Sequence, residues 1–141
     1  MRKTFLALLM VGVLGFALAE EQGAPKFSVG LDSPIFAWVS TDGNGGITSL
    51  LGFNLGLGFS YRSYFEPLQV KKGSTYWEAG TILLIDPYFG IGYDYRFTEE
   101  IYAGGGVDIY PLNLIFGAAF LGPYAAYLSI VPNIHVGFYL Y

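Results

Sequence analysis

The chain has 141 residues, of which 53% are apolar, 18% aromatic and only 13% charged, and its formal net charge at pH 7 is −4. Soluble domains carry about 25% charged residues, so this chain has too little charge for a water-facing surface, and its acidic balance disfavours nucleic acid as a partner. The absence of cysteine excludes disulfides, thiol catalysis and cysteine-ligated metal sites.

The first 19 residues have the three parts of a secretory signal peptide. Arg2 and Lys3 precede the apolar run FLALLMVGVLGF, and residues 17–19 form a small-x-small cleavage site. The alternative is an uncleaved anchor helix, but the run is shorter than the ~20 residues that a membrane span needs. We therefore predict a signal peptide at 1–19 and one mature domain at 20–141. Without Arg2 and Lys3, five of the seven basic residues remain against 11 acidic ones, a net charge near −6.

The first half of the mature chain alternates bulky and small residues, which is the period of a β-strand. Residues 27–39 follow this pattern with an interruption at Pro34, which cannot donate to a strand ladder. The segment TDGNGG at 41–46 is a turn, because Asp-Gly and Asn-Gly tolerate positive φ. Residues 47–62 alternate again; their Gly-x-Gly lacks the third glycine and following helix of a dinucleotide site.

The middle of the chain contains the clearest pattern. After a connection predicted at 63–74 and a strand at 75–85, residues 86–110 read as a hairpin, DPYFGIGYDYRF-TEE-IYAGGGVDIY. Large side chains such as Phe89, Ile91 and Tyr93 alternate there with glycine and charged residues. One face of such a hairpin suits lipid and the other a narrow polar interior.

The last third is ambiguous. Residues 112–131 contain no charge, which is long enough for a membrane-spanning helix. However, Gly122-Pro123 interrupts the run and prolines at 111 and 132 bracket it, which favours strands with tight turns. We therefore predict strands here, with an α-helical membrane protein spanning near 112–131 as the alternative.

Together these segments predict an all-β fold, an antiparallel up-and-down transmembrane β-barrel that follows a cleaved signal peptide. Closure is required because lipid cannot satisfy the backbone groups of an open sheet edge. Bulky side chains are expected to face the bilayer, and glycine and the few charges to face the barrel axis. The eight predicted strands are 27–39, 47–62, 75–85, 88–97, 101–110, 112–121, 124–131 and 133–141.

The signal peptide, the paired motifs FGIGYDYRF and IYAGGGVDIY around a short turn, and the terminal Tyr141 resemble the small eight-stranded outer-membrane barrels of the OmpX and OmpA-domain type. The resemblance implies a monomer in the bacterial outer membrane, in contact with its lipids and recognised by the barrel-assembly machinery through Tyr141. Tyr139 fits this C-terminal signal, whereas Gly137 and His135 depart from its apolar alternation. The long extracellular loops of many relatives are missing, which argues against adhesion or receptor roles.

A charge cluster is predicted in the lumen. Charges inside a narrow barrel are expected to pair with one another and plug it, because an unpaired buried charge is costly. Asp94 and Arg96 share a strand and Asp108 lies on its hairpin partner, so these three are candidates for such a cluster. A selectivity or proton-conducting lining is the alternative. The candidates are Asp32, Arg62, Glu78, Asp94, Arg96 and Asp108.

No catalytic, cofactor or metal site is predicted. His135 is the sole histidine and no serine motif surrounds it, as a barrel enzyme acting on lipids would require. Asp42 and Asn44 lack the later carboxylate of a calcium loop. We therefore expect a non-enzymatic protein with a structural, membrane-stabilising or minor permeability role. The alternatives are a lipid-modifying barrel enzyme using His135, and a soluble periplasmic barrel with an apolar ligand, for which the polar surface is too small.

Overall fold

The computed structural model describes residues 23–31, 34–54, 57–121 and 129–141. Some predictions therefore lie wholly or partly outside the described residues, including residues 32–33 and 55–56 of the strands predicted at 27–39 and 47–62. They also include the signal peptide at 1–19, the position of Asp32, and residues 124–128 of the strand predicted at 124–131.

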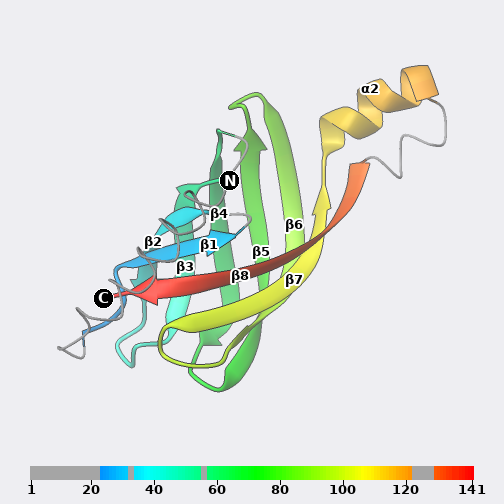
Figure 1. The fold of residues 1–141 in the computed structure, drawn as a ribbon. Helices are drawn as coiled ribbons and strands as arrows, with labels where there is room; N and C mark the ends of the chain where they lie inside the picture. Colours follow the sequence, from blue (N-terminus) through cyan, green and yellow to red (C-terminus); the bar gives the residue numbers. More distant parts are fainter. Residues whose placement is uncertain (1–22, 32–33, 55–56, 122–128) are drawn as a thin grey trace, which may run out of the picture.

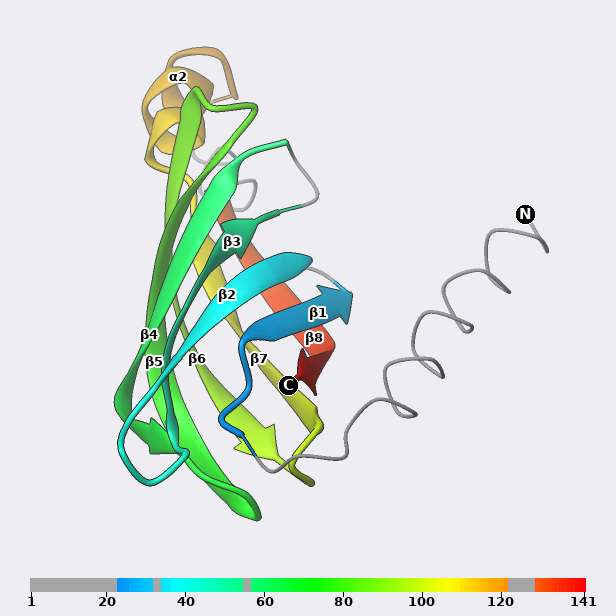
Figure 2. The same cartoon turned by 90° about the vertical axis from the view of Figure 1, so that its left-hand side faces the viewer.

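The described residues form a closed antiparallel barrel of eight strands with up-and-down topology, which confirms the predicted barrel and strand number (Figures 1 and 2). Each strand pairs with the next, and β1 pairs with β8 from Phe27↔Leu140 to Leu31↔Val136. A helix, α2 (Pro111–Leu121), is inserted before the last strand. The strands are β1 (Phe27–Leu31), β2 (Phe36–Thr41), β3 (Ile47–Phe53), β4 (Phe59–Leu68), β5 (Lys72–Ile82), β6 (Asp86–Arg96), β7 (Ile101–Ile109) and β8 (Ile130–Leu140).

The strand predicted at 47–62 is two strands, β3 and β4, and this part of the prediction is wrong. Asn54 holds the turn between them: its side-chain amide donates to the Thr81 carbonyl (2.8 Å), and its Oδ1 accepts the Gly58 N–H (3.0 Å). Phe53 and Phe59 then pair directly and both face outward. The alternation keeps its phase across the turn, so the sequence pattern hides it. The segment predicted at 27–39 is likewise two strands, β1 and β2.

The turns on either side of β5 also differ from the prediction. The connection predicted at 63–74 is mostly strand, since β4 runs to Leu68 and β5 begins at Lys72. At its other end β5 stops at Ile82, and Leu83 and Leu84 take the left-handed conformation, with φ of 52° and 62°. Leucine rarely adopts this conformation, so the sequence carries no turn signal there.

Residues 111–121 form helix α2, so the strand predicted at 112–121 is wrong. Pro111 occupies the first helical position, where its missing N–H costs nothing. The segment is apolar throughout apart from Asn113, and a continuous apolar run shows neither strand nor helix periodicity. In the described part of the chain, no helix has the length and apolar character needed to cross a membrane.

The two faces of the barrel wall differ as the alternation predicts. Phe53, Leu57, Phe89 and Tyr93 are exposed on the outside. The inside holds the charged residues together with a row of buried tyrosines that the sequence analysis did not assign to the lumen. These tyrosines are Tyr64, Tyr76, Tyr88, Tyr102 and Tyr139.

Glycines on the inner face make room for these tyrosines. Tyr102 pairs in register with Gly137, and a Cβ at Gly137 would lie 2.5 Å from three atoms of the Tyr102 ring. Tyr88 covers Gly80 in the same way, where a Cβ would lie 2.6 Å from its ring. An eight-stranded barrel has an interior just wide enough for side chains to fill, so these two rings fit because the neighbouring strand has no side chain at Gly137 and Gly80.

Candidate functional site

The centre of the lumen is occupied by an ion-paired cluster around Arg62. Arg62 on β4 pairs in register with Glu78 on β5, and the guanidinium contacts Glu78 Oε2 through Nε (2.8 Å) and Nη2 (2.7 Å). Its Nη1 lies 3.0 Å from Oδ2 of Asp94 on β6. All three side chains are buried, with exposed fractions of 3% or less. One cation therefore bridges two carboxylates on neighbouring strands, which is the arrangement that makes buried charge tolerable.

Tyrosines complete the hydrogen bonding of the two carboxylates. The Tyr64 hydroxyl donates to Asp94 Oδ2 (2.5 Å) and the Tyr88 hydroxyl to Glu78 Oε1 (2.6 Å). The Arg62 guanidinium also lies 4.1 Å from the centre of the Tyr76 ring, in cation–π contact. We call Arg62, Glu78, Asp94, His135 and these three tyrosines the lumen network.

His135 joins the lumen network through a single ring nitrogen. Its Nε2 lies 2.6 Å from Asp94 Oδ1 and 2.8 Å from Arg62 Nη1. A ring nitrogen donates when it carries a proton and accepts when it does not, so Nε2 cannot donate to the carboxylate and accept from the guanidinium at the same time. The shorter distance and the negative charge favour donation to Asp94. His135 on β8 thus binds the Asp94 carboxylate of β6 across β7, where Gly104 pairs with both residues.

The structure brings together three of the predicted charges, Arg62, Glu78 and Asp94, but separates Arg96 from them. Two residues along one strand are about 6.6 Å apart, and the hydrogen bonds of Arg96 lead to the end of the barrel instead of to Asp94. Asp108 accepts a hydrogen bond from the Asn133 side chain on β8 (2.8 Å). Asp32 lies outside the described residues.

His135 and the tyrosines are the members that sequence reasoning missed. His135 was interpreted as a rim or lumen histidine without a catalytic role, but its contact with Asp94 was not predicted, because its strand lies far in sequence from Asp94. Tyr64 stands two residues from Arg62 and so shares its face. That spacing is a usable signal, but it lies within the segment predicted as a connection.

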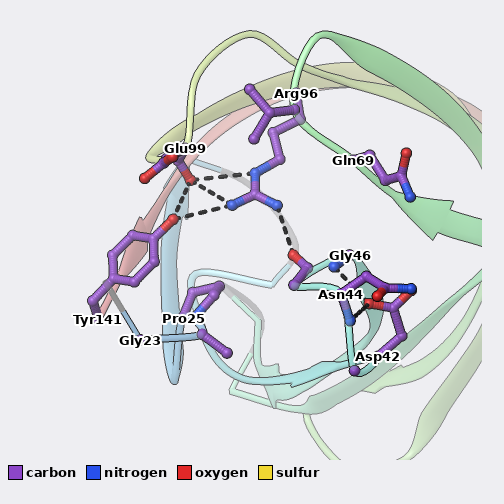
Figure 3. Close-up of a pocket in the computed structure, with 13 residues that line it drawn as sticks. Gly23, Pro25, Asp42, Asn44, Gly46, Gln69, Arg96, Glu99 and Tyr141 are labelled. Carbon is purple, nitrogen blue, oxygen red and sulfur yellow. Dashed lines mark hydrogen bonds between the residues drawn. The ribbon is translucent and has the colours of Figure 1, made fainter. Parts of the chain in front are cut away.

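A second polar region lies at the barrel end that carries Gly23 and Tyr141 (Figure 3). Here Arg96 donates to the Glu99 carbonyl through Nε and Nη2, to the Gly45 carbonyl through Nη1 (3.2 Å), and to the Tyr141 hydroxyl through Nη2 (3.1 Å). The cavity has a volume of about 630 Å³. Its lining residues are Gly23, Ala24, Pro25, Asp42, Gly43, Asn44, Gly45, Gly46, Gln69, Val70, Arg96, Glu99 and Tyr141.

Arg96 stabilises this end of the barrel by donating hydrogen bonds to uncharged oxygen atoms. It links the turn at 42–46, the turn at 97–100 and the last residue, Tyr141, whose hydroxyl donates to the Glu99 carbonyl (3.0 Å). Burial raises the pKa of the Tyr141 phenol above its ordinary value, and the adjacent Arg96 charge opposes that rise. The region holds turns together and presents no reactive pair of side chains among its described hydrogen bonds.

No family model, curated protein or solved structure matches the chain. Its function must therefore be argued from its own geometry.

The acidic residues and His135 have no arrangement typical of a metal site in the described part of the chain. Within residues 23–31, 34–54, 57–121 and 129–141, no three His, Cys, Asp or Glu side chains lie together in a way that could hold a metal ion. The Asp42 carboxylate is used by its own turn, where Oδ1 accepts the N–H groups of Asn44 (2.9 Å) and Gly46 (2.8 Å). His135 Nε2 contacts Arg62 and Asp94, two charged members of the lumen network.

Proposed function

We propose that this protein is a small outer-membrane β-barrel that is non-enzymatic and has a structural, membrane-stabilising role. The observation that carries the proposal is the outer wall. Large apolar side chains such as Ile91 (60% exposed), Phe65 (69%) and Ile134 (87%) point away from the barrel on different strands. An apolar surface of this extent would be unstable in water and suits hydrocarbon.

A belt of aromatic rings on this wall supports the same environment. Phe36 contacts Trp38 (5.7 Å between ring centres), Trp38 contacts Phe53 (5.9 Å), and Phe53 contacts Phe59 (4.8 Å). These outward rings cross three adjacent strands, β2, β3 and β4. Outward aromatic rings are favourable against lipid and costly in water, so they support a membrane environment for this part of the wall.

The filled lumen favours a structural role over conduction. The lumen network occupies the centre of the barrel, and Tyr102 and Tyr139 stack beside it (4.6 Å between ring centres). An ion crossing the barrel would have to separate Arg62 from its carboxylates, which is costly for buried pairs. A minor permeability role would require this network to open.

The partners proposed with this role are outer-membrane lipids and, during assembly, the barrel-assembly machinery, with the folded chain a monomer. In the folded barrel the Tyr141 hydroxyl is bonded to Arg96 and Glu99. Recognition of Tyr141 would therefore precede closure of the β1–β8 seam. The predicted leader at 1–19 would direct the chain out of the cytoplasm.

The lipid-enzyme alternative gains little support. A catalytic histidine must reach its substrate, but His135 is 5% exposed and points into the lumen toward Asp94 and Arg62. Replacement His135→Ala is expected to leave the lipid composition of an expressing cell unchanged. Loss of a lipid product would restore the enzyme hypothesis.

Insertion into lipid tests the proposal directly. The isolated chain is diluted from denaturant into phospholipid vesicles or into buffer alone, and folding is followed by circular dichroism and by a heat-sensitive gel shift. We expect a folded β-barrel only with vesicles. A charge on the outer wall, Ile91→Arg, should weaken folding by about 2–4 kcal/mol because it places a cation in hydrocarbon.

The matched control is Asn44→Arg, the same cation in an exposed turn, which should fold like the parent. Folding in buffer alone, or equal behaviour of the two arginine variants, would overturn the membrane proposal. Vesicles loaded with a fluorescent dye should retain it; release would instead support the permeability role.

A further inference from the structure

The two ends of the barrel are built from different residues. In this topology the connections β1–β2, β3–β4, β5–β6 and β7–β8 share one end, which we call the helix end because it carries α2 (Figures 1 and 2). The opposite turn end carries the turns 42–46, 69–71 and 97–100. Those turns include Asp42, Lys71, Glu99 and Glu100.

The connections of the helix end carry no charge within their described residues, which are 34–35, 54, 57–58, 83–85, 110–121 and 129. They expose large apolar side chains instead: Leu57 is 78% exposed, Ile85 75% and Ile115 64%. Loops of a barrel that rise into water are polar. Apart from Asp86, the first residue of β6, the described part of the helix end therefore resembles the outer wall in composition and not a water-facing rim.

Backbone conformation gives a second, independent sign. Leu57, Leu83 and Leu84 lie in the left-handed region, at φ of 54°, 52° and 62°. Glycine or asparagine adopts this region with less strain than a bulky residue. In water these leucines would combine backbone strain with apolar exposure, and neither would be compensated. In hydrocarbon the exposed side chains would be favourable, which offsets the strain.

Helix α2 is apolar on all sides except at Asn113. The consecutive residues Leu114, Ile115 and Phe116 are each 43–64% exposed, and residues 100° apart on a helix cannot share one buried face. A helix that is apolar all round belongs in a protein core or in lipid. It touches the barrel only weakly, beside β6, so no protein core surrounds it.

This apolar surface is continuous with the barrel wall. Ile109 ends β7 just before the helix and Ile130 begins β8 after it; these two residues pair in register and are exposed on the outer face. With 11 residues the helix is about 16 Å long, roughly half of the ~30 Å hydrocarbon thickness. It is thus long enough to lie within one leaflet and too short to span two.

We infer that the helix end is embedded in lipid: α2 and the leucine turns at 57 and 83–85 lie among the acyl chains of one leaflet. The occupant of this surface is phospholipid or glycolipid acyl chain, and the inference rests on the proposed membrane barrel. The barrel therefore contacts lipid over its wall and over one of its ends, and its water-facing region is concentrated at the turn end.

Single cysteines test this placement cleanly, because the chain has no cysteine of its own. Ile115→Cys on α2, Ile91→Cys on the wall and Asn44→Cys at the turn end are each labelled with an environment-sensitive fluorophore. The full chain is folded into phosphatidylcholine vesicles with bromine atoms on their acyl chains. We expect the labels at 115 and 91 to be quenched to a similar extent, several-fold more than the label at 44.

The outcomes separate the two proposals. Quenching at 91 with a label at 115 that behaves like the one at 44 would overturn the lipid-embedded helix end and leave the membrane barrel standing. Absence of quenching at 91 would overturn both.

A second copy of the chain is the competing occupant of this surface. Under mild oxidation Ile115→Cys should remain monomeric at high lipid-to-protein ratio. Efficient disulfide dimers with an unquenched label at 115 would overturn the inference in favour of a helix-to-helix dimer. Two serine variants of the protein labelled at 115 are compared. Phe116→Ser should reduce the quenching more than Leu84→Ser, because only Phe116 lies on the same helix as the label. Leu84→Ser should fold normally.

Discussion

The inner and outer faces of the same strands obey different rules. On β6, Tyr93 is 50% exposed on the outer wall, while its neighbour Asp94 is fully buried and bonded to Arg62, Tyr64 and His135. One residue along the backbone separates an apolar surface from a charged interior. The strand geometry is shared, so the surroundings on each side decide which residues are stable there.

This difference teaches where the specificity of the barrel lies. Outside, any large apolar side chain serves, because contact with lipid is not directional. Inside, the charges of the lumen network bind specific partners, and several tyrosine rings lie against a glycine on the neighbouring strand, as Tyr102 lies against Gly137. Changes of similar size should therefore cost much more inside than outside.

The largest effect is expected at the centre of the lumen network. Arg62→Ala leaves Glu78 and Asp94 as buried carboxylates without their cation, and it should lower the free energy of unfolding by about 3–5 kcal/mol. Tyr61→Ala, the adjacent outward residue, should cost clearly less. Urea unfolding in phospholipid vesicles measures both, with Arg62→Lys expected in between because it keeps the charge but loses the planar fork. Equal losses for Arg62→Ala and Tyr61→Ala would show that the two faces do not differ.

An intermediate effect is expected where a ring meets a glycine. Gly137→Ala places a methyl group against the Tyr102 ring and should destabilise the barrel by about 1–3 kcal/mol through overpacking. The matched control is Gly43→Ala, where a Cβ would meet no atom within 4 Å. Combining Gly137→Ala with Tyr102→Ala should cost less than the sum of the two single changes in the same unfolding assay. An additive result would mean that the two residues do not compete for the same space.

The smallest effect is expected at the turn end. Tyr141→Phe removes one hydroxyl that links Arg96 to the Glu99 carbonyl, and it should reduce stability by about 0.5–1.5 kcal/mol. Tyr61→Phe on the outer wall should change stability less. Hydrogen exchange of the turn 97–100 provides the local measurement, and it should quicken in Tyr141→Phe alone. Unchanged hydrogen exchange in this turn would contradict the proposal that the bonds between Tyr141, Arg96 and Glu99 stabilise the turn end.

Several features of the fold could be predicted from residue order. The hairpin of β6 and β7 was predicted within two residues, because its period of two is unbroken and its turn is polar. The outward positions of Phe89 and Tyr93 follow from the same pattern. Arg62, Glu78 and Asp94 were assigned to the inner face for the same reason, although their pairing was not.

Other features depended on contacts between distant segments. The helix at 111–121 and the leucine turn at 83–85 carry local patterns that suit strands equally well. The β3–β4 turn was hidden because Asn54 holds it through Thr81, a partner 27 residues away. His135 joined Asp94 only because β8 and β6 face the same narrow lumen.

The amino-acid sequence alone determined that the chain alternates, that its wall is apolar and that its few charges face inward, because these properties follow from the two-residue period of each strand. The tertiary structure decided which charge meets which, where the chain turns, and that one uncharged segment is a helix. Those choices depend on strand register and barrel closure, which bring together groups as far apart in the sequence as Arg62 and His135. A local residue pattern carries no information about such contacts.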